Sequence, residues 1–559
     1  MKIRNPFFPR RAIGQVTTLT GPPRAFRTAA SLLVFAAVLM PPNGESAEEA
    51  KKPNIIVLMA DDLGYADLGF LPYAADDVRT PNLDRLAAGG TWFSDAYVTS
   101  PICSASRAAI ITGKYQQRWG NYSLAKSGEG LPSDEVTLPQ ALKDLGYATK
   151  KIGKNHYGGR GSDSQPWKHG FDEFLGFEGS TKSYVRLSEQ DQEELGPENA
   201  RVYTVAAGPL VKYADGQRES VSYEDTYISD VFGDEALEYI QRERGDKPFF
   251  LEVDFNAVHH PQYEVNPRYL DPWGLEQMMW TPDSELSTAD WHRTHGWLME
   301  VDPDGRKRYL ACLFGMDEAI GKILDGLESQ GIADNTLVVF LSDNGGSQNV
   351  YASNGPLHGH KYTLAEGGVR VPMVMRWPGR VPADEKITEP VMSLDVFPTC
   401  VAAAGGTPAE DVDGRSLLPL LEGQQNGSLH EAIFWDQGTA DRPDWGIRMG
   451  PWKLREAPGS GETRTYSGPD SYGRPTEERS GLTFFKYLSP TGLVLVNLDE
   501  NLDEQVNVAD ENPEKVAELT GRFQEWRSQM AEPFKRQKSS ATESTVKAEV
   551  SAPVEDSEP

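Results

Sequence analysis

The chain has 559 residues with 38% hydrophobic and 10% aromatic content, enough for one large domain and a smaller one. Its 83 Asp and Glu outnumber 55 Lys and Arg, which gives a formal net charge of −28 at pH 7. This balance argues against nucleic acid as a partner, because phosphate binding needs a positive surface. The three cysteines, Cys103, Cys312 and Cys400, are too few for a disulfide framework, although Cys312 and Cys400 could still pair.

The first segment has the pattern of a secretory signal peptide. Basic residues are scattered over residues 2–27, residues 29–40 are nearly all apolar, and a small-residue exit ends at Ala47. We therefore predict a signal peptide over 1–47 and an exported protein, periplasmic or extracellular. The apolar run is shorter than the roughly 20 residues that cross a bilayer, so we expect no permanent membrane span.

Strand-like and helix-like segments then alternate along the chain. Residues 54–59, 147–152, 248–255 and 336–341 read as strands, and residues 81–88, 138–145 and 315–327 read as helices. This alternation predicts an α/β fold over 52–425, with a mostly parallel sheet sandwiched by helices. Ligands of such sheets bind beyond the carboxyl ends of the strands, and Asp, Asn, His or Lys follows each of these four strands.

The pattern changes from about residue 426 onward. Residues 445–455 and 492–498 read as short strands, and residues 513–530 read as a helix behind them. We therefore predict a small C-terminal α+β domain over 426–534, an antiparallel sheet capped by a helix. Residues 535–559 are rich in Ser, Thr, Ala, Lys and Glu and have no aromatic residue, which predicts a disordered tail.

Two of the strand ends carry oxygen-bearing side chains, Asp61 and Asp62 after the first and Asp343 and Asn344 after the last. Either pair alone could be a set of turn or cap residues. Together they offer three carboxylates and a carboxamide oxygen, a set that suits a hard cation such as Ca²⁺ or Mg²⁺. Adjacent carboxylates repel unless a cation neutralises them, so we predict a metal site here.

Cationic side chains gather in three further segments. A single surface Lys or His is usually just solvated, but five of the nine histidines fall in these segments. This clustering predicts a site that binds an anion and handles protons. The residues are Lys154 and His156 after the second strand, His259 and His260 after the third, and His358, His360 and Lys361 further on.

Cys103 stands where a helix begins, with Arg107 one turn later. It could be a small buried core cysteine or a thiolate nucleophile. Neither interpretation explains the oxygen ligands predicted around it, because thiolates prefer softer metals.

The segment around Cys103 resembles the signature of the type I sulfatases, members of the alkaline-phosphatase-like superfamily. In that family the cysteine is oxidised after synthesis to formylglycine. The resemblance extends from about Asn54 to about Met530, with further landmarks in family order. The signature is carried by Cys103, Ala105, Arg107 and Thr112-Gly113, and the landmarks by Asp61-Asp62, residues 343–345, Lys361, residues 366–372 and residues 414–417.

The resemblance implies a role for each candidate residue. Ca²⁺, with Mg²⁺ as the less favoured ion, would be bound by Asp61, Asp62, Asp343, Asn344 and residue 103. One hydroxyl of the hydrated aldehyde at residue 103 would attack sulfur while Arg107 holds it. The second hydroxyl would then expel sulfate and regenerate the aldehyde, with His156 as the base. His259 and Lys361 would serve the leaving oxygen and Lys154 the sulfate, with His260 and His360 as further substrate-binding candidates. Ala105 and Asn155 stand where many relatives have Pro and Trp, which puts the pocket wall near Asn155 in question.

These expectations combine into an exported, calcium-dependent sulfatase acting on sulfated carbohydrates, similar to the N-acetylgalactosamine-6-sulfatases. Its expected partner is a formylglycine-generating or anaerobic sulfatase-maturing enzyme. Two alternatives stay open: a phosphate or phosphonate ester hydrolase of the same superfamily, and a non-catalytic relative that only binds sulfated glycans. Residues 180–221 and 263–305 look like insertions that shape substrate choice.

Overall fold

The computed structural model describes residues 51–123, 130–157, 164–177, 179, 184, 210–223, 226–260, 265–277, 304–347, 350–438, 443–457 and 492–534. The predicted signal peptide over 1–47 and the predicted tail over 535–559 lie outside these residues, as do parts of both predicted insertions. Within the described part of the chain, no helix is long and apolar enough to cross a membrane.

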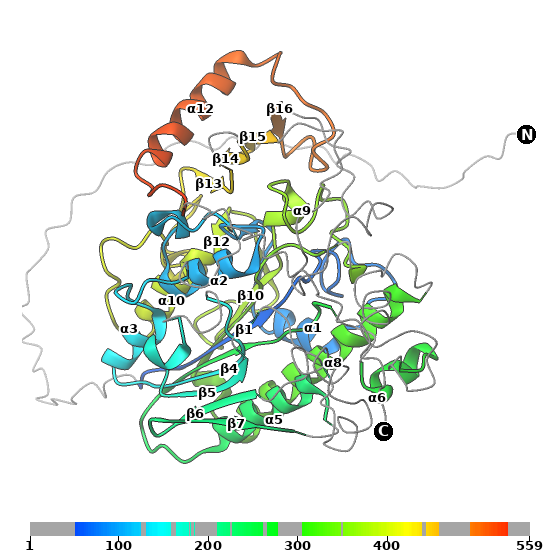
Figure 1. The fold of residues 1–559 in the computed structure, drawn as a ribbon, viewed down its shortest axis with the longest axis vertical. Helices are drawn as coiled ribbons and strands as arrows, with labels where there is room; N and C mark the ends of the chain where they lie inside the picture. Colours follow the sequence, from blue (N-terminus) through cyan, green and yellow to red (C-terminus); the bar gives the residue numbers. More distant parts are fainter. Residues whose placement is uncertain are drawn as a thin grey trace, which may run out of the picture. The chain divides into compact units, whose positions relative to one another are not determined.

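A ten-stranded sheet organises the described chain, in the order β11-β2-β10-β9-β1-β8-β4-β5-β6-β7. Figure 1 labels β10, β1, β4, β5, β6 and β7 of this sheet. Its five central strands, β9 to β5 in that order, run parallel, whereas β10, β6 and β7 pair antiparallel with their neighbours. The central strands are β9 (Thr336–Ser342), β1 (Asn54–Ala60), β8 (Phe249–Asp254), β4 (Ala148–Lys154) and β5 (Glu173–Phe177). The outer strands are β11 (Glu385–Ile387), β2 (Thr91–Phe93), β10 (Met373–Arg376), β6 (Leu210–Ala214) and β7 (Gln217–Val221).

Helices cover both faces of this sheet. The side chains of its central strands are therefore buried on both sides. In β1, Ile56 and Leu58 join one core cluster and Ile55 and Val57 join the other. The first cluster includes residues of α1 (Pro81–Ala88), α5 (Ile228–Gln241) and α8 (Gly305–Ser329). The second includes residues of α2 (Cys103–Thr112), α3 (Leu138–Asp144) and α10 (Val396–Ala403). The predicted mostly parallel sheet between helices is confirmed.

A second, antiparallel sheet follows in the C-terminal part, with β13 (Ile433–Asp436), β14 (Trp445–Met449), β15 (Trp452–Ala457) and β16 (Gly492–Asn497). Helix α12 (Pro513–Arg527) packs on it, with Phe523 stacked on Trp445 at 4.2 Å between ring centroids. The predicted small sheet with its helix is therefore confirmed. Buried ion pairs join it to the preceding chain, including Lys453 Nζ to Glu366 Oε1 at 2.8 Å.

All three cysteines are free and buried. Cys312 lies on α8 in one core cluster and Cys400 on α10 in the other. The pairing that the sequence left open is therefore not formed.

Candidate active site

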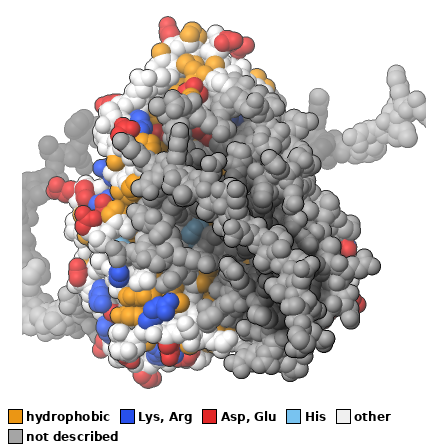
Figure 2. All heavy atoms as spheres, in the orientation of Figure 1, with side chains coloured by type: hydrophobic (Ala, Val, Ile, Leu, Met, Phe, Trp, Pro, Cys, Tyr) orange, Lys and Arg blue, Asp and Glu red, His pale blue; other side chains and the backbone are white. Residues whose placement is uncertain are grey.

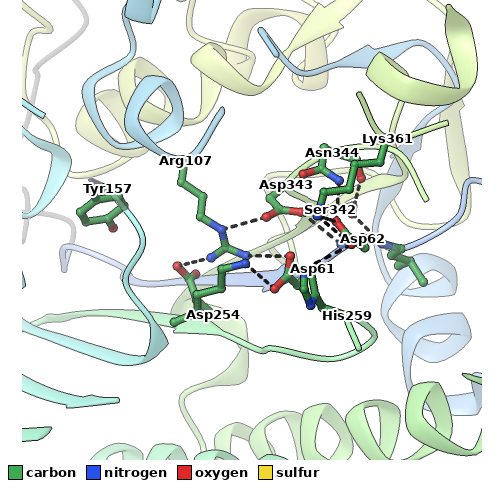
Figure 3. A network of polar contacts seen from close by, with 12 residues as sticks. Asp61, Asp62, Arg107, Tyr157, Asp254, His259, Ser342, Asp343, Asn344 and Lys361 are labelled. Atoms are coloured by element: carbon green, nitrogen blue, oxygen red, sulfur yellow. Dashed lines mark hydrogen bonds and ion pairs between the residues drawn. The ribbon is translucent and has the colours of Figure 1, made fainter. Parts of the chain in front are cut away.

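The parallel central strands end at one edge of the sheet, and their ends carry the polar residues that the sequence singled out. Asp61 and Asp62 follow β1, and Asp343 and Asn344 follow β9. The register pairs Ala60 with Ser342, so the two groups lie side by side. Figure 3 shows their side chains converging with Arg107, His259 and Lys361.

The four oxygen-bearing residues form one buried cluster. The Asp62 amide donates to Asp343 Oδ1 at 3.2 Å, and Asn344 Nδ2 donates to Asp62 Oδ1 at 2.8 Å. Two buried oxygens, Asp61 Oδ1 and Asn344 Oδ1, accept no hydrogen bond from the described residues. Unsatisfied carboxylate and carboxamide oxygens are ligands for a hard cation, so these residues fit Ca²⁺ or Mg²⁺.

His259 joins this cluster more closely than the sequence indicated. Its Nε2 lies 3.7 Å from Asp62 Oδ2, and one ligand atom each from Asp61, Asp62 and His259 lie within 4.8 Å of one another. The oxygen ligands therefore have the imidazole of His259 within reach.

Two lysines neutralise the aspartates that follow β1. Lys154, the last residue of β4, places Nζ 2.5 Å from Asp61 Oδ2. Lys361 places Nζ 2.6 Å from Asp62 Oδ1. Both lysines are buried, so their charges act at short range in a poorly hydrated site. In Figure 2 acidic and basic side chains are intermixed on the described surface.

Arg107 reaches the strand ends from α2, whose ten residues are all buried. Its Nε donates to Asp343 Oδ2 at 2.8 Å and its Nη1 to Asp254 Oδ2 at 2.9 Å, while Nη2 lies 4.0 Å from Asp61 Oδ1. Burial by itself would lower the pKa of this guanidinium, but the three carboxylates raise it above its usual value. Arg107 is therefore a fixed positive charge that links β1, β8 and β9.

Cys103 is the first residue of α2 and is only 4% exposed. Burial raises the pKa of its thiol, against the opposing effect of Lys154 and Lys361, with Asp61 and Asp343 raising it further. An unmodified Cys103 is thus held as the thiol, which is a weak nucleophile. Because Asp61, Asp343 and both lysines act on this thiol, Cys103 lies near the aspartate cluster and near the lysines.

Three histidines border the same cluster. Burial lowers the pKa of His156, His259 and His260 well below the usual value, and nearby cations including Lys154 and Lys361 lower it further. His156 has a left-handed backbone, with φ of 49°, and its buried Nδ1 has no hydrogen-bond partner among the residues that the structure describes. These imidazoles are neutral near pH 7 and can accept a proton.

His360 is oriented differently from the other candidates. Its Nδ1 donates to the Lys361 carbonyl oxygen at 2.7 Å, and burial lowers its pKa to about 4. His358 makes a 3.0 Å contact with Gln505 Nε2. The segment thus directs Lys361 to Asp62 and His358 toward the C-terminal sheet region.

Sequence reasoning missed the polar residues that lie inside strands, above all Asp254 of β8 and Lys151 of β4. Lys151 Nζ lies 2.5 Å from Asp254 Oδ2, and both side chains are fully buried. The available signal was the alternation of Glu252 and Asp254 within the otherwise apolar segment 248–255.

A mostly parallel sheet between helices, with this cluster at its strand ends, defines a hydrolase of the alkaline-phosphatase-like fold. The Sulfatase family model matches residues 53–406, and the model of the N-sulphoglucosamine sulphohydrolase C-terminal region matches residues 358–456. The chain belongs to the sulfatase family and is a sulfuric ester hydrolase. The resemblance stated from the sequence is therefore confirmed.

Individual relatives agree with this assignment. N-acetylgalactosamine-6-sulfatase of Homo sapiens is 34% identical over 412 residues, which cover 69% of this chain and 68% of that protein. Steryl-sulfatase of Homo sapiens is 31% identical over 455 residues, which cover 69% and 72%. The crystal structure of Ps i-CgsB in complex with k-i-k-neocarrahexaose matches with a TM-score of 0.68 at 28% identity, covering 86% of this chain and 94% of that one.

Proposed function

We propose that this sulfatase is an exported, calcium-dependent enzyme that hydrolyses sulfate esters of carbohydrates and uses residue 103 as formylglycine. The observation that carries the proposal is the position of Cys103. It lies at the start of α2 among oxygen ligands and cations, yet burial keeps its thiol protonated. A thiol is poorly suited to this site, whereas a hydrated aldehyde at the same position would supply a hydroxyl nucleophile.

Asp61, Asp62, Asp343 and Asn344 would hold the cation. The unsatisfied Asp61 Oδ1 and Asn344 Oδ1 support this set, and the all-oxygen chemistry favours Ca²⁺ over softer metals. When bound, the cation would supply positive charge to the sulfate oxygens and to residue 103. The domains assigned to this function are 52–425 for catalysis and 426–534 as the C-terminal domain.

The chain's own cations would hold the sulfate group. Arg107 is fixed by Asp343 and Asp254. Lys154 pairs with Asp61, and Lys361 pairs with Asp62. Fixed positive groups stabilise the negative charge that develops in the transition state, typically by about 3–4 kcal/mol per donor. A sulfate ester would displace the lysines from their aspartates only in part, because each ammonium group has three protons to donate.

Hydrolysis consumes water and yields an alcohol and sulfate, so one proton must leave the nucleophile and one must reach the leaving oxygen. His156 is neutral, its buried Nδ1 has no hydrogen-bond partner among the described residues, and it would accept the proton of the second hydroxyl when that hydroxyl expels sulfate and regenerates the aldehyde. His259 and Lys361 are the candidates for the leaving oxygen, with His260 and His360 as further substrate contacts. Residue 103 would require a formylglycine-generating or anaerobic sulfatase-maturing enzyme as a partner.

The carbohydrate assignment rests on the names of two relatives, an N-acetylgalactosamine-6-sulfatase and a protein crystallised with a neocarrahexaose. The steryl-sulfatase relative makes sterol sulfates the natural comparison substrate. Export to the periplasm or the extracellular space rests on the predicted signal peptide over 1–47.

The test is mass spectrometry of the peptide containing residue 103, combined with turnover of matched sulfate and phosphate esters. We expect an aldehyde at residue 103, a sulfate preference, and no turnover by Cys103→Ala. An unmodified thiol in protein that turns over sulfate esters contradicts the nucleophile. A preference for phosphate or phosphonate esters supports the alternative hydrolase, and glycan binding without turnover by the modified protein supports the binding-only alternative.

A further inference from the structure

Asp254 lies on the side of the Arg107 guanidinium away from Asp343 (Figure 3), and it belongs to a buried group of charged and polar side chains. Asp254 Oδ2 accepts from Arg107 Nη1 at 2.9 Å and from Lys151 Nζ at 2.5 Å. Lys151 also contacts Glu252 and the Tyr157 hydroxyl, which in turn donates to Glu252 Oε1 at 2.6 Å. We call these four residues, Lys151, Tyr157, Glu252 and Asp254, the Asp254 cluster.

The charged side chains of the Asp254 cluster are buried, which makes their desolvation unfavourable. Lys151 and Asp254 are fully buried and Glu252 is 3% exposed, inside the two central strands β4 and β8. Well-packed apolar residues often stabilise such positions better than an ion pair does, because desolvation offsets the Coulomb attraction. A gain in folding stability therefore does not explain well why charged residues occupy these positions. Their contact with Arg107 suggests instead that they serve the active site.

Arg107 has two carboxylate partners, and only one of them is a proposed cation ligand. Asp343, which binds Nε, is also one of the four proposed cation ligands, so its charge is shared. Asp254, which binds Nη1, belongs to no part of that ligand set and is held by Lys151 from β4. Two anchors from separate strands fix both the position and the plane of a guanidinium.

We infer that Asp254 is a positioning residue that holds Arg107 against the nucleophile at residue 103, and that Lys151 holds the Asp254 carboxylate in place. Asp254 touches neither substrate nor residue 103 in this role. The inference rests on the proposed function, because it assigns Arg107 to the reacting group. A misplacement of about 1 Å at such a group can cost about 100-fold in rate, which sets the expected size of the effect.

The experiment compares Asp254→Asn and Asp254→Glu with Asp317→Asn in the full-length, matured enzyme. Asp317 of α8 is a matched control, since it is a buried carboxylate that accepts from the amides of Asn82 and Leu83 and contacts none of the residues assigned to the site in its hydrogen bonds within the described chain. Turnover of a sulfate ester by the wild type is measured first, so that a failure of the proposed function is seen separately. Folded fraction and calcium affinity are measured for every variant.

We expect Asp254→Asn to lower kcat about 100-fold per folded molecule, with KM within about threefold of the wild type. Asp254→Glu should recover part of kcat because it restores a carboxylate acceptor for Arg107, whereas Asp317→Asn should change only stability. Calcium binding should persist in Asp254→Asn and disappear in Asp343→Asn. Wild-type kcat in Asp254→Asn, equal losses in Asp254→Asn and Asp317→Asn, a change in KM alone, or loss of calcium binding by Asp254→Asn would each overturn the inference.

Discussion

Lys361 and Asp62 form a buried ion pair in which Nζ lies 2.6 Å from Oδ1 and 2.8 Å from Oδ2. Asp62 adopts a left-handed backbone with φ of 64°, an uncommon conformation that directs its carboxylate into the site. The pair thus neutralises an aspartate that we propose as a cation ligand.

Replacing Lys361 by Met should make the fold dependent on calcium. Without its partner the buried Asp62 carboxylate is unpaired, which typically costs about 3–5 kcal/mol. A bound cation would neutralise that carboxylate, so calcium should restore most of the lost free energy of unfolding. Urea unfolding in EGTA and in calcium measures both states.

Lys453→Met is the matched control for Lys361→Met. Lys453 is a fully buried lysine paired with Glu366 and Glu504 in the C-terminal region, outside the proposed cation ligands. Its loss should destabilise the protein equally in EGTA and in calcium. The same calcium response in both variants would contradict the proposed cation site.

The burial of α2 leads to a prediction about maturation. Cys103 is 4% exposed and every residue of α2 is buried, so an enzyme that oxidises Cys103 has no access in the folded chain. Protein folded without the maturing enzyme should stay inactive when that enzyme is added later. Unfolding and refolding in its presence should yield formylglycine, measured by mass spectrometry, and efficient conversion of the folded form would contradict the prediction.

The strand ends could be predicted from sequence because parallel strands share one edge for their carboxyl ends. From sequence alone, this rule predicts that four residues lie close together: Asp61, Asp62, Asp343 and Asn344. It says nothing about a residue inside a strand, such as Asp254 or Lys151, whose polar side chain looks like an exception to an apolar pattern. Only tertiary packing brings Arg107 from α2 onto Asp254.

Element boundaries were less predictable for a similar reason. The sequence predicts a helix over 315–327, but α8 begins at Gly305. The first turns contain Arg306, which pairs with the buried Asp67 at 2.7 Å, and Arg308, which is buried. Strands β2 and β11 have three residues each, too few for a periodic signal.

Acid should weaken the protein through Glu366, which begins the short helix α9 (Glu366–Val369) and pairs with Lys453 and Arg370. Burial by itself would raise the pKa of Glu366, but Lys453, Arg370 and Arg448 lower it to about 2. A carboxyl whose folded pKa is depressed stabilises the protein above its unfolded pKa of about 4.5, and this contribution is lost as pH falls toward 2.

The Glu366→Gln variant should therefore be less stable than the wild type at pH 6 and approach it between pH 4.5 and pH 2. The shift of about 2.5 pKa units corresponds to about 3 kcal/mol. Urea unfolding across this pH range measures the difference. The exposed Glu328 provides a control, since Glu328→Gln should leave the profile unchanged. A constant difference between Glu366→Gln and the wild type at all pH values would contradict the linkage.

The last prediction concerns Gly153, which precedes Lys154 at the end of β4. Its φ is +98°, and a Cβ there would lie 2.0 Å from the carbonyl oxygen of Asp254 on the neighbouring strand. Gly146 has a similar φ of +92°, but nothing lies within 4 Å of a Cβ at that position. Comparing an Ala substitution at each position therefore distinguishes the cost of backbone strain, which both share, from the cost of a steric clash, which only Gly153 has.

Gly146→Ala should cost about 1–2 kcal/mol, the penalty of a left-handed backbone for a residue with a Cβ. Gly153→Ala should cost about 2 kcal/mol more, because the strands must separate to admit the methyl group. That separation would also displace Lys154 and Asp254, so turnover per folded molecule should fall in Gly153→Ala alone. Equal stability in the two variants, or full activity in Gly153→Ala, would show that β4 and β8 can part there without disturbing the site.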